Sequence, residues 1–257
     1  MEVYYQNDDV KLYQGDCLKI MDKLIEQGVK VDAVIADIPY GTTQCKWDEI
    51  IPFDKMWDKI HQLSSPQTPI VLFGSEPFSS KLRMSNIKNY KYDWKWDKVV
   101  GSNFVHAKRM PLKIYEDIMV FYKKQPVYNP QMTERKKENE RKTGKSKLQK
   151  NRINGINHII TDTKGKKKYP VNKIKINRLT GELNSKHIVH PAQKPLDLME
   201  YLINTYTNEG DLILDFTCGS GTTLVAAQNL GRKSIGIELE EEYCRITKER
   251  LLESGSA

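Results

Sequence analysis

The sequence predicts an α/β fold built on a mostly parallel β-sheet. Short apolar runs of the kind that form buried parallel strands occur at 31–36, 69–73 and 211–216. Segments in which apolar residues recur every three or four positions, as in amphipathic helices, occur at 17–27, 53–63 and 195–206. Strands that alternate with helices in this way are typical of an α/β domain.

The elements of the N-terminal part follow from local patterns. The predicted strands are 11–15, 31–36, 69–73, 90–96 and 114–122, and the predicted helices are 17–27 and 53–63. Gly28 ends the first helix and Gly74 breaks the third strand. Trp94 and Trp96 are two positions apart, so we expect both in the core on one face of their strand. Ser75 could contact a ligand at the edge of the sheet, but we favour a role as the cap of a helix that starts at Glu76 or Pro77.

Regular elements resume near His190. The pattern predicts a helix at 195–206, a strand at 211–216, a helix at 222–230, a strand at 234–237 and a final helix at 240–252. Gly231 is expected to end the second of these helices.

The segment between these two parts is strongly basic. The chain has a net charge of +8, but 19 Lys and Arg against 5 Asp and Glu lie between Lys123 and Lys186, so the remainder carries −6. This asymmetry favours a polyanionic partner such as nucleic acid, although a solvated or disordered loop is an equal alternative on charge alone. We divide the chain into 1–124, a basic insert at 125–186 with strands at 156–160 and 171–176, and 187–257.

Composition also limits the class of protein. No apolar run approaches the ~20 residues that span a bilayer, and the N-terminus lacks a signal-peptide pattern. The four cysteines, Cys17, Cys45, Cys218 and Cys244, form no CxxC pair, which argues against a zinc site or a disulfide framework. His106 and His190 are not spaced as metal ligands. We therefore expect a cytoplasmic protein that binds no metal and no membrane.

A glycine turn in the C-terminal part suits an adenosine-type ligand. The strand 211–216 ends at Thr217-Cys218-Gly219-Ser220-Gly221, and this turn opens the next helix at Thr222. One strand later, Glu238 can accept hydrogen bonds from both hydroxyls of a ribose. The turn differs from GxGxxG, and no GxxxxGK[ST] loop is present, which disfavours NAD and ATP. A glycine turn alone is as often a tight structural bend.

The most specific stretch is Asp37-Ile38-Pro39-Tyr40, directly after the strand 31–36. The Asp37 carboxylate and the Ile38 carbonyl could accept the two N–H bonds of an exocyclic base amino group, which frees its lone pair for direct methyl transfer. Pro39 fixes the turn and has no N–H to compete. Tyr40 offers a stacking face for a base taken out of the duplex. Alone, this pattern is equally an ordinary turn with a core tyrosine.

Taken together, these motifs resemble the DNA amino methyltransferases that carry a DPPY-type motif, with Ile38 in place of the usual first proline. Asp215–Gly221 resembles the cofactor motif of that family, His190-Pro191-Ala192-Gln193-Lys194-Pro195 resembles the segment before it, and Gly15-Asp16-Cys17-Leu18 resembles a further cofactor-contacting motif. The catalytic motif precedes the cofactor motif, which is the order of the beta group.

The resemblance implies a fold, a cofactor and a reaction. The fold is a Rossmann-like seven-stranded mostly parallel sheet with helices on both faces and an antiparallel hairpin, and the insert is the target-recognition region. The cofactor is S-adenosyl-L-methionine. We expect it to be bound by the following residues: Asp16, Cys17, Asp37, Lys194, Asp215, Phe216, Gly219, Ser220, Gly221, Thr222 and Glu238.

The expected reaction is sequence-specific methylation of adenine N6 in double-stranded DNA, because Asp at the first motif position more often accompanies adenine. Cytosine N4 methylation, a catalytically inactive DNA-binding protein, and an RNA or protein methyltransferase stay open as alternatives. A bacterial or phage-encoded protein, monomeric or homodimeric and paired with a cognate restriction endonuclease, would fit. Trp47, in the loop after Tyr40, could close over the site.

Overall fold

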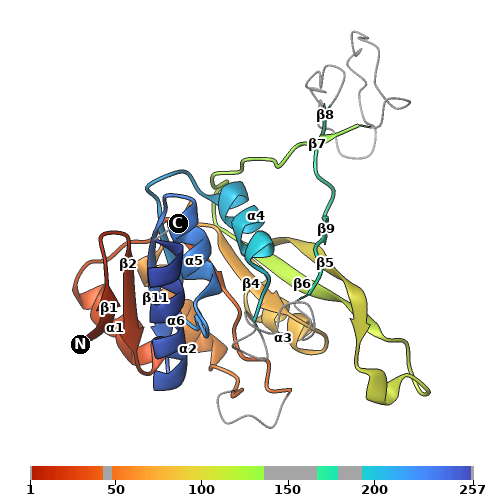
Figure 1. The fold of residues 1–257 in the computed structure, drawn as a ribbon, viewed down its shortest axis with the longest axis horizontal. Helices are drawn as coiled ribbons and strands as arrows, with labels where there is room; N and C mark the ends of the chain where they lie inside the picture. Colours follow the sequence, from red (N-terminus) through yellow and green to blue (C-terminus); the bar gives the residue numbers. More distant parts are fainter. Residues whose placement is uncertain (1, 43–47, 136–166, 179–192, 256–257) are drawn as a thin grey trace. The chain divides into compact units, whose positions relative to one another are not determined.

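The computed structural model describes residues 2–42, 48–135, 167–178 and 193–255. Its centre is a nine-stranded sheet, in which all strands but β1 and β6 run in one direction (Figure 1). In spatial order the strands are β1 (Val3–Gln6), β2 (Val10–Gln14), β11 (Lys233–Glu238), β10 (Leu212–Asp215), β3 (Ala33–Ala36), β4 (Ile70–Gly74), β6 (Lys113–Phe121), β5 (Tyr90–Ser102) and β9 (Lys173–Lys175).

Helices cover both faces of the sheet. One face packs against α1 (Cys17–Glu26), α2 (Phe53–Leu63) and α3 (Phe78–Ser85). The other face packs against α4 (Leu196–Tyr206), α5 (Thr222–Asn229) and α6 (Glu241–Ser254). The central strand β3 divides its side chains accordingly: Val34 and Ala36 face the first set of helices, and Ala33 and Ile35 face the second. All four side chains are buried, as expected for a parallel strand covered on both sides.

The predicted Rossmann-like α/β fold with an antiparallel hairpin is confirmed, and its hairpin is β5–β6. The expected seven strands are extended by the edge strands β1 and β9. The predicted helix 53–63 matches α2, and Trp94 and Trp96 are buried in one cluster, as expected. The prediction that Ser75 caps α3 is wrong: the helix begins at Phe78 with Pro77 at the N-cap, and the Glu76 carboxylate accepts the N–H of Ser80 at 3.2 Å in its first turn.

The chain forms two compact units. The first consists of Met1–Asn129 with Asn172–Ala257, and the second consists of Pro130–Val171. In the second unit, β7 (Thr133–Glu134) pairs antiparallel with β8 (Lys167–Lys168). The strand predicted at 171–176 forms β9 and pairs with β5 in the first unit instead of in the insert. The predicted strand 156–160, Trp47, Cys45 and the first residues of the 190–195 segment lie outside the described residues. In the part of the chain that is described, no helix has the length and apolar character to cross a membrane.

Candidate active site

The carboxyl ends of β3 and β10 form the centre of the candidate site. These strands are neighbours, but β3 is followed by β4 on one side and β10 by β11 on the other, so the strand order reverses between them. Ligands of open α/β sheets bind at such a switch point, beyond the carboxyl ends of the strands. A cavity of about 750 Å³ opens at this edge.

The structure brings the two predicted halves of the site together around this cavity. The predicted residues that line it are Asp16, Cys17, Asp37, Ile38, Pro39, Tyr40, Lys194, Asp215, Phe216, Gly219, Ser220, Thr222 and Glu238. Gly221 is the predicted residue that is not among them. Its φ is +73°, and a Cβ atom there would lie 2.4 Å from Cγ2 of Thr247, so the turn geometry and close packing against α6 account for the glycine.

Both carboxylate oxygens of Asp37 have partners. The Tyr40 hydroxyl donates a hydrogen bond to Oδ1 at 2.7 Å, and the Lys194 ammonium forms an ion pair with Oδ2. Burial raises the pKa of the Asp37 carboxyl, and the adjacent Lys194 opposes that rise. Burial and the Asp37 charge raise the pKa of the Tyr40 hydroxyl, so this hydroxyl is a donor at neutral pH.

A chain of alternating charges continues behind Asp37. Lys194 Nζ lies 3.5 Å from Oε2 of Glu116, and Lys98 Nζ lies 3.0 Å from Oε1 of the same carboxylate. Burial alone would raise the pKa of Glu116, but the two lysines hold it below its ordinary value. Burial alone would lower the pKa of Lys194, but Asp37 and Glu116 raise it. Each buried charge in the chain is therefore balanced by an opposite one.

The ring of Tyr40 is held against neighbouring groups. It stacks on Phe78 with the ring centroids 5.1 Å apart and an interplanar angle of 29°. The Lys194 ammonium lies 5.9 Å from the Tyr40 ring centroid, within the range of a cation–π contact. Stacking and the hydrogen bond to Asp37 together fix the orientation of this side chain.

The turn that contains Tyr40 is held by Asp48, a residue that the sequence analysis did not select. The Asp48 carboxylate accepts hydrogen bonds from three successive backbone N–H groups: Tyr40 at 2.8 Å, Gly41 at 2.9 Å and Thr42 at 2.8 Å. Asp48 is buried and lines the cavity. An acceptor that gathers three adjacent donors fixes the backbone from Tyr40 onward, and with it the position of the Tyr40 side chain.

Glu238 holds the glycine turn after β10 in a similar way. Its carboxylate accepts the N–H of Gly219 at 2.8 Å on one oxygen and the N–H of Glu240 at 2.9 Å on the other. The Glu238 backbone carbonyl accepts the N–H of Gly15 at 2.8 Å, which joins the loop that carries Asp16 to the end of β11. A carboxylate has about four acceptor positions, so Glu238 retains capacity for a ligand.

The cofactor half of the cavity suits an adenosine without phosphates. Asp16 and Glu238 both line it, and no Lys or Arg is present among the described lining residues from the β2–α1, β10–α5 and β11–α6 loops. Two carboxylates can bind hydroxyl and amino groups, and they also favour a cation. The residues present therefore fit a nucleoside that carries a positively charged sulfonium, and they lack the cations that a triphosphate would need.

Asp215 is buried and Cys17 is half-buried, and burial changes the acid–base properties of both. Asp215 Oδ2 accepts a hydrogen bond from Thr223 Oγ1 at 2.5 Å, and burial raises the pKa of this carboxyl to about 7. Burial, with Asp16 adding to it, raises the pKa of the Cys17 thiol to about 12. Cys17 is thus protonated at neutral pH and unsuited to nucleophilic chemistry, consistent with a reaction that needs no cysteine.

Lys98 and Glu116 were also missed by sequence reasoning. They come from β5 and β6, the hairpin strands beyond β4, and both line the cavity. The available signal was the occurrence of Glu116 and Asp117 just before the apolar run 118–121, where the chain turns from exposed hairpin to buried sheet.

The fold is that of a Rossmann-like methyltransferase, and comparison with known proteins identifies the family. The DNA methylase family model matches residues 31–249. The chain is 26% identical to type II methyltransferase M1.MboII of Moraxella bovis over 91% of this chain and 93% of that protein. It is 28% identical to DNA adenine methyltransferase YhdJ of Escherichia coli (strain K12) over 96% of this chain and 84% of that protein. A stretch of 62 residues is 55% identical to type II methyltransferase M2.DpnII of Streptococcus pneumoniae and spans only 23% of that relative.

Solved structures agree with this assignment. The M1.HpyAVI–SAM complex matches with a TM-score of 0.63 and 26% identity, covering 94% of this chain and 98% of that one. The PvuII DNA methyltransferase (cytosine-N4-specific) matches with a TM-score of 0.65 at 17% identity, over 97% and 88% of the two chains, which supports the fold. The chain belongs to the DNA methylase family, whose members take the methyl group from S-adenosyl-L-methionine.

Proposed function

We propose that this protein methylates adenine N6 in double-stranded DNA. The observation that carries the proposal is the carboxylate of Asp37 at the first motif position, at the switch point of the sheet and beside Tyr40 and Lys194. A carboxylate is a strong acceptor for the amino N–H of adenine. The similarity over most of both chains to a protein described as a DNA adenine methyltransferase supports this choice of base.

In this proposal the catalytic turn prepares the amino group for attack. S-adenosyl-L-methionine supplies an electrophilic methyl group on a positively charged sulfur. Asp37 and the Ile38 backbone carbonyl accept the two amino N–H bonds, which turns the nitrogen lone pair toward that methyl group. Pro39 keeps the turn free of a competing N–H, and Tyr40 stacks on the flipped base. Lys194 favours the ionised form of Asp37. When the amino group binds, the Lys194 ammonium moves away from Asp37, so that a carboxylate oxygen is free to accept the N–H. Its ion pair with Glu116 holds the ammonium in the site.

The cofactor is held by the opposite half of the cavity. Glu238 accepts the ribose hydroxyls and Asp16 accepts from the adenine. Gly219 and Ser220 bring the backbone close to the nucleoside, and Phe216 packs on it. Cys17, Asp215, Gly221 and Thr222 shape the two turns, and Lys194 lies between the two halves.

The basic insert at 125–186 is assigned to target recognition. Its charge would contribute sequence-independent attraction to phosphates, and residues within it would contact base edges. A homodimer and a cognate restriction endonuclease remain expectations of the family likeness. On the basis of the same family likeness, we assign the protein to the cytoplasm.

Labelled methyl transfer tests the proposal. Purified wild type with tritiated S-adenosyl-L-methionine and plasmid DNA should label the DNA, and mass spectrometry of digested nucleosides should find N6-methyladenine. At a cofactor concentration that saturates the variant, Asp37→Ala should reduce the single-turnover rate about 10³-fold or more, because it removes the amino-group acceptor. N4-methylcytosine in the digest would reassign the base. Cofactor binding without any labelling, in both proteins, would contradict the proposed activity.

A further inference from the structure

The hairpin that joins β5 to β6 carries an exposed apolar surface. We call residues 99–112 the hairpin tip. It projects from the sheet as the yellow segment in Figure 1. Of the 17 exposed large hydrophobic side chains among the described residues, seven lie in the short stretch from Val99 to Tyr115. Val105 is 92% exposed and Phe104 is 59% exposed. A soluble protein rarely leaves such a concentration of apolar side chains in water unless a partner covers it.

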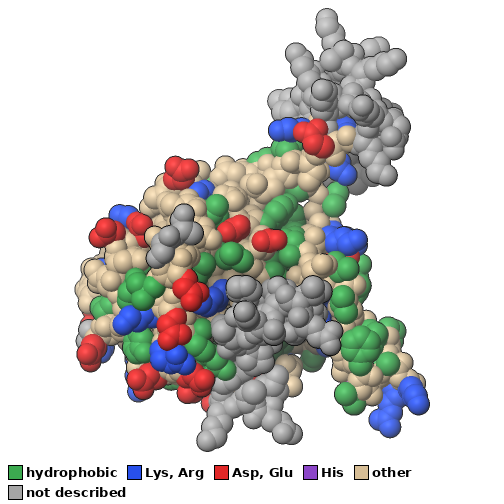
Figure 2. Space-filling view, viewed as in Figure 1, with side chains coloured by type: hydrophobic (Ala, Val, Ile, Leu, Met, Phe, Trp, Pro, Cys, Tyr) green, Lys and Arg blue, Asp and Glu red, His purple; other side chains and the backbone are tan. Residues whose placement is uncertain are grey.

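The hairpin tip is also cationic. Lys108 and Arg109 are exposed beside the apolar residues, and Figure 2 shows the blue side chains at the outer end of the hairpin, next to green ones. No Asp or Glu occurs from Val99 to Tyr115. The combination of apolar side chains with uncompensated positive charge is complementary to nucleic acid, which offers both phosphates and base faces.

The hairpin tip begins at the mouth of the cavity. Ser102 at the end of β5 and Lys113 at the start of β6 both line the cavity. β5 runs in the same direction as β3, so its carboxyl end lies at the edge that carries Asp37. Phe104 follows Ser102 by two residues, so its Cα lies within about 7 Å of a lining residue.

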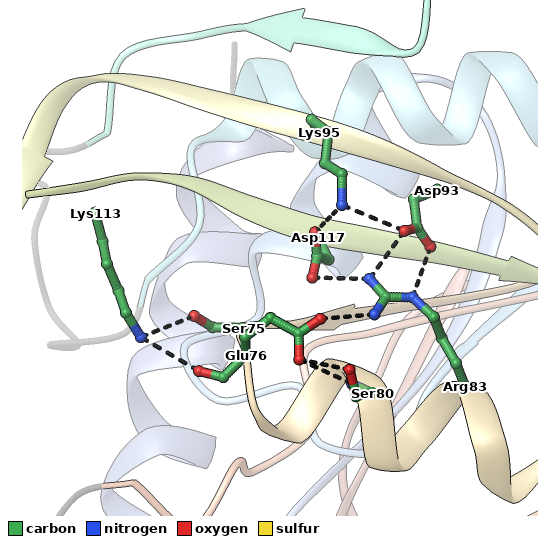
Figure 3. Close-up of polar contacts among 8 residues, drawn as sticks. All are labelled: Ser75, Glu76, Ser80, Arg83, Asp93, Lys95, Lys113 and Asp117. Atoms are coloured by element: carbon green, nitrogen blue, oxygen red, sulfur yellow. Dashed lines mark hydrogen bonds and ion pairs between the residues drawn. The ribbon is translucent and has the colours of Figure 1, made fainter. Parts of the chain in front are cut away.

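A network of ion pairs attaches the strands of the hairpin to α3 (Figure 3). Arg83 on α3 donates to Asp93 of β5 and Asp117 of β6, each at 2.9 Å, and Lys95 bridges the same two carboxylates. Lys113 reaches the Ser75 hydroxyl at 3.5 Å and the Glu76 carbonyl at 3.3 Å. Both strands of the hairpin are thereby attached to the loop and helix after β4, which also contributes to the site.

The pairing of β5 with β6 is irregular where the hairpin tip begins. The register of β5 against β6 shifts between Asp97 and Ser102, and Val99 has a φ of +65°. Such a conformation is costly for a β-branched residue and persists only where the surroundings hold it, most often at functional sites. Bulges next to active sites serve to redirect a strand.

We propose that the hairpin tip is a wedge that enters the target duplex beside the flipped base, with Phe104 and Val105 replacing its lost stacking contacts and Lys108 and Arg109 binding the adjoining phosphates. This inference rests on the proposed function, because it assigns a second contact to the same DNA substrate. A duplex that gives up one base leaves an unstacked gap, and DNA-bending proteins show that apolar side chains can enter between base pairs of a duplex.

Duplex DNA accounts for more of the observations than another partner does. A second copy packed tip to tip would explain the apolar residues, but it would leave the cations without opposite charge, since the hairpin tip has no acidic residue. A membrane surface would suit both features, but it would cover the mouth of the cavity at which the hairpin begins. A DNA substrate must reach that mouth in any case.

The test compares paired and mismatched substrates. Sequencing of DNA methylated by the wild type gives the target site, from which a 30-base-pair duplex and a version with the target base mismatched are made. The variant Phe104→Ala/Val105→Ala should methylate the paired duplex about 10-fold or more slowly, and the mismatched duplex at close to the wild-type rate, because a mismatched base is already unpaired. The matched control is Met84→Ala/Ile87→Ala, which removes two exposed apolar side chains near the opposite edge of the sheet and should change neither rate.

A binding measurement separates this inference from the proposed function. Fluorescence anisotropy with calf-thymus duplex fragments should show that Lys108→Ala/Arg109→Ala lowers the slope of log affinity against log salt by about two.

If the wild type methylates DNA and the Phe104/Val105 variant has the same rates as the wild type on both duplexes, the wedge proposal is wrong and the proposed function stands. An equal loss on both duplexes also overturns the wedge. If no DNA is methylated but the Lys108/Arg109 variant loses that salt slope, the proposed activity fails and the DNA-binding surface is retained. Loss of activity that follows loss of a dimer in light scattering would assign the surface to a second copy.

Discussion

The turns after β3 and β10 lie on neighbouring strands, and each is held by a carboxylate from elsewhere in the chain. Asp48 gathers the three N–H groups of Tyr40, Gly41 and Thr42, whereas Glu238 takes one N–H on each oxygen. The first arrangement commits the carboxylate to the backbone and fixes a catalytic side chain. The second leaves acceptor capacity facing the cavity, as a ligand-binding carboxylate requires.

The two aspartates at the ends of these strands differ more sharply. Asp37 has an ammonium partner, Lys194, while the partners of Asp215 among the described residues are the Thr223 hydroxyl and the Thr217 N–H. Because no cation is paired with it, burial raises the pKa of Asp215 to about 7. Burial raises the pKa of both carboxyls, but the Lys194 ammonium opposes the rise at Asp37, whereas Asp215 has only uncharged hydrogen-bond donors to oppose it.

The largest effect that follows from this comparison is expected at Lys194. Lys194→Met removes the cation that opposes the rise in the pKa of Asp37, so that pKa should rise further. If the ionised form accepts the amino N–H, the rate is lost as pH falls through that pKa, and the variant should lose it at a higher pH. We expect a single-turnover rate about 10²- to 10³-fold lower at pH 7 and partial recovery as the pH is raised.

The control for this experiment is Lys55→Met, an exposed lysine on α2 outside the cavity lining. It should leave the pH–rate profile unchanged. A Lys194→Met profile that is lower at every pH but not displaced would mean that Lys194 acts on the cofactor or the base and not on the ionisation of Asp37.

A smaller effect is expected from the carboxylate that holds the catalytic turn. Asp48→Ala leaves three backbone N–H groups without their acceptor, whereas Asp48→Asn keeps one oxygen. We expect methyl transfer to slow about 10- to 100-fold in the alanine variant because Tyr40 loses its fixed position, with a smaller loss in the asparagine variant. Urea unfolding should show about 1–3 kcal/mol of destabilisation for alanine. Asp54→Ala, at an exposed position on α2, is the matched control. Equal activity of the alanine variant and the wild type would show that the turn keeps its shape without Asp48.

The sequence allowed the two turns to be predicted but not the groups around them. Asp37 and Glu238 end apolar strands, and strand ends of a parallel sheet meet at one edge, so their proximity follows from the strand pattern alone. Glu116 and Lys98 reach the site only because β6 lies between β4 and β5 and runs in the opposite direction. Spacing along the chain does not reveal that arrangement. Asp48 was inconspicuous for another reason, since the sequence does not show that the N–H groups of residues 40–42 all point to its carboxylate.

The smallest effect concerns the stability of the fold at Asp215. The pKa of the Asp215 carboxyl is about 7 in the folded protein, whereas the ordinary value for an aspartate, which applies to the unfolded chain, is 3.8. The folded state therefore binds the proton more tightly than the unfolded state does. The stability it contributes is therefore present below about pH 4 and is lost as pH rises through about 7.

Asp215→Asn keeps the shape and the Thr223 and Thr217 partners but cannot ionise. It should thus become more stable than wild type as pH rises from 5 to 8.5. A full conversion of the pKa difference is about 4 kcal/mol, and relaxation around the charge reduces it, so we expect on the order of 1 kcal/mol, or about 2–4 °C in Tm. The exposed Asp197→Asn serves as the control. Parallel Tm curves for Asp215→Asn and wild type would mean that Asp215 is ionised throughout this range. The contrast between a lysine-paired and an unpaired carboxylate at this edge would then be wrong.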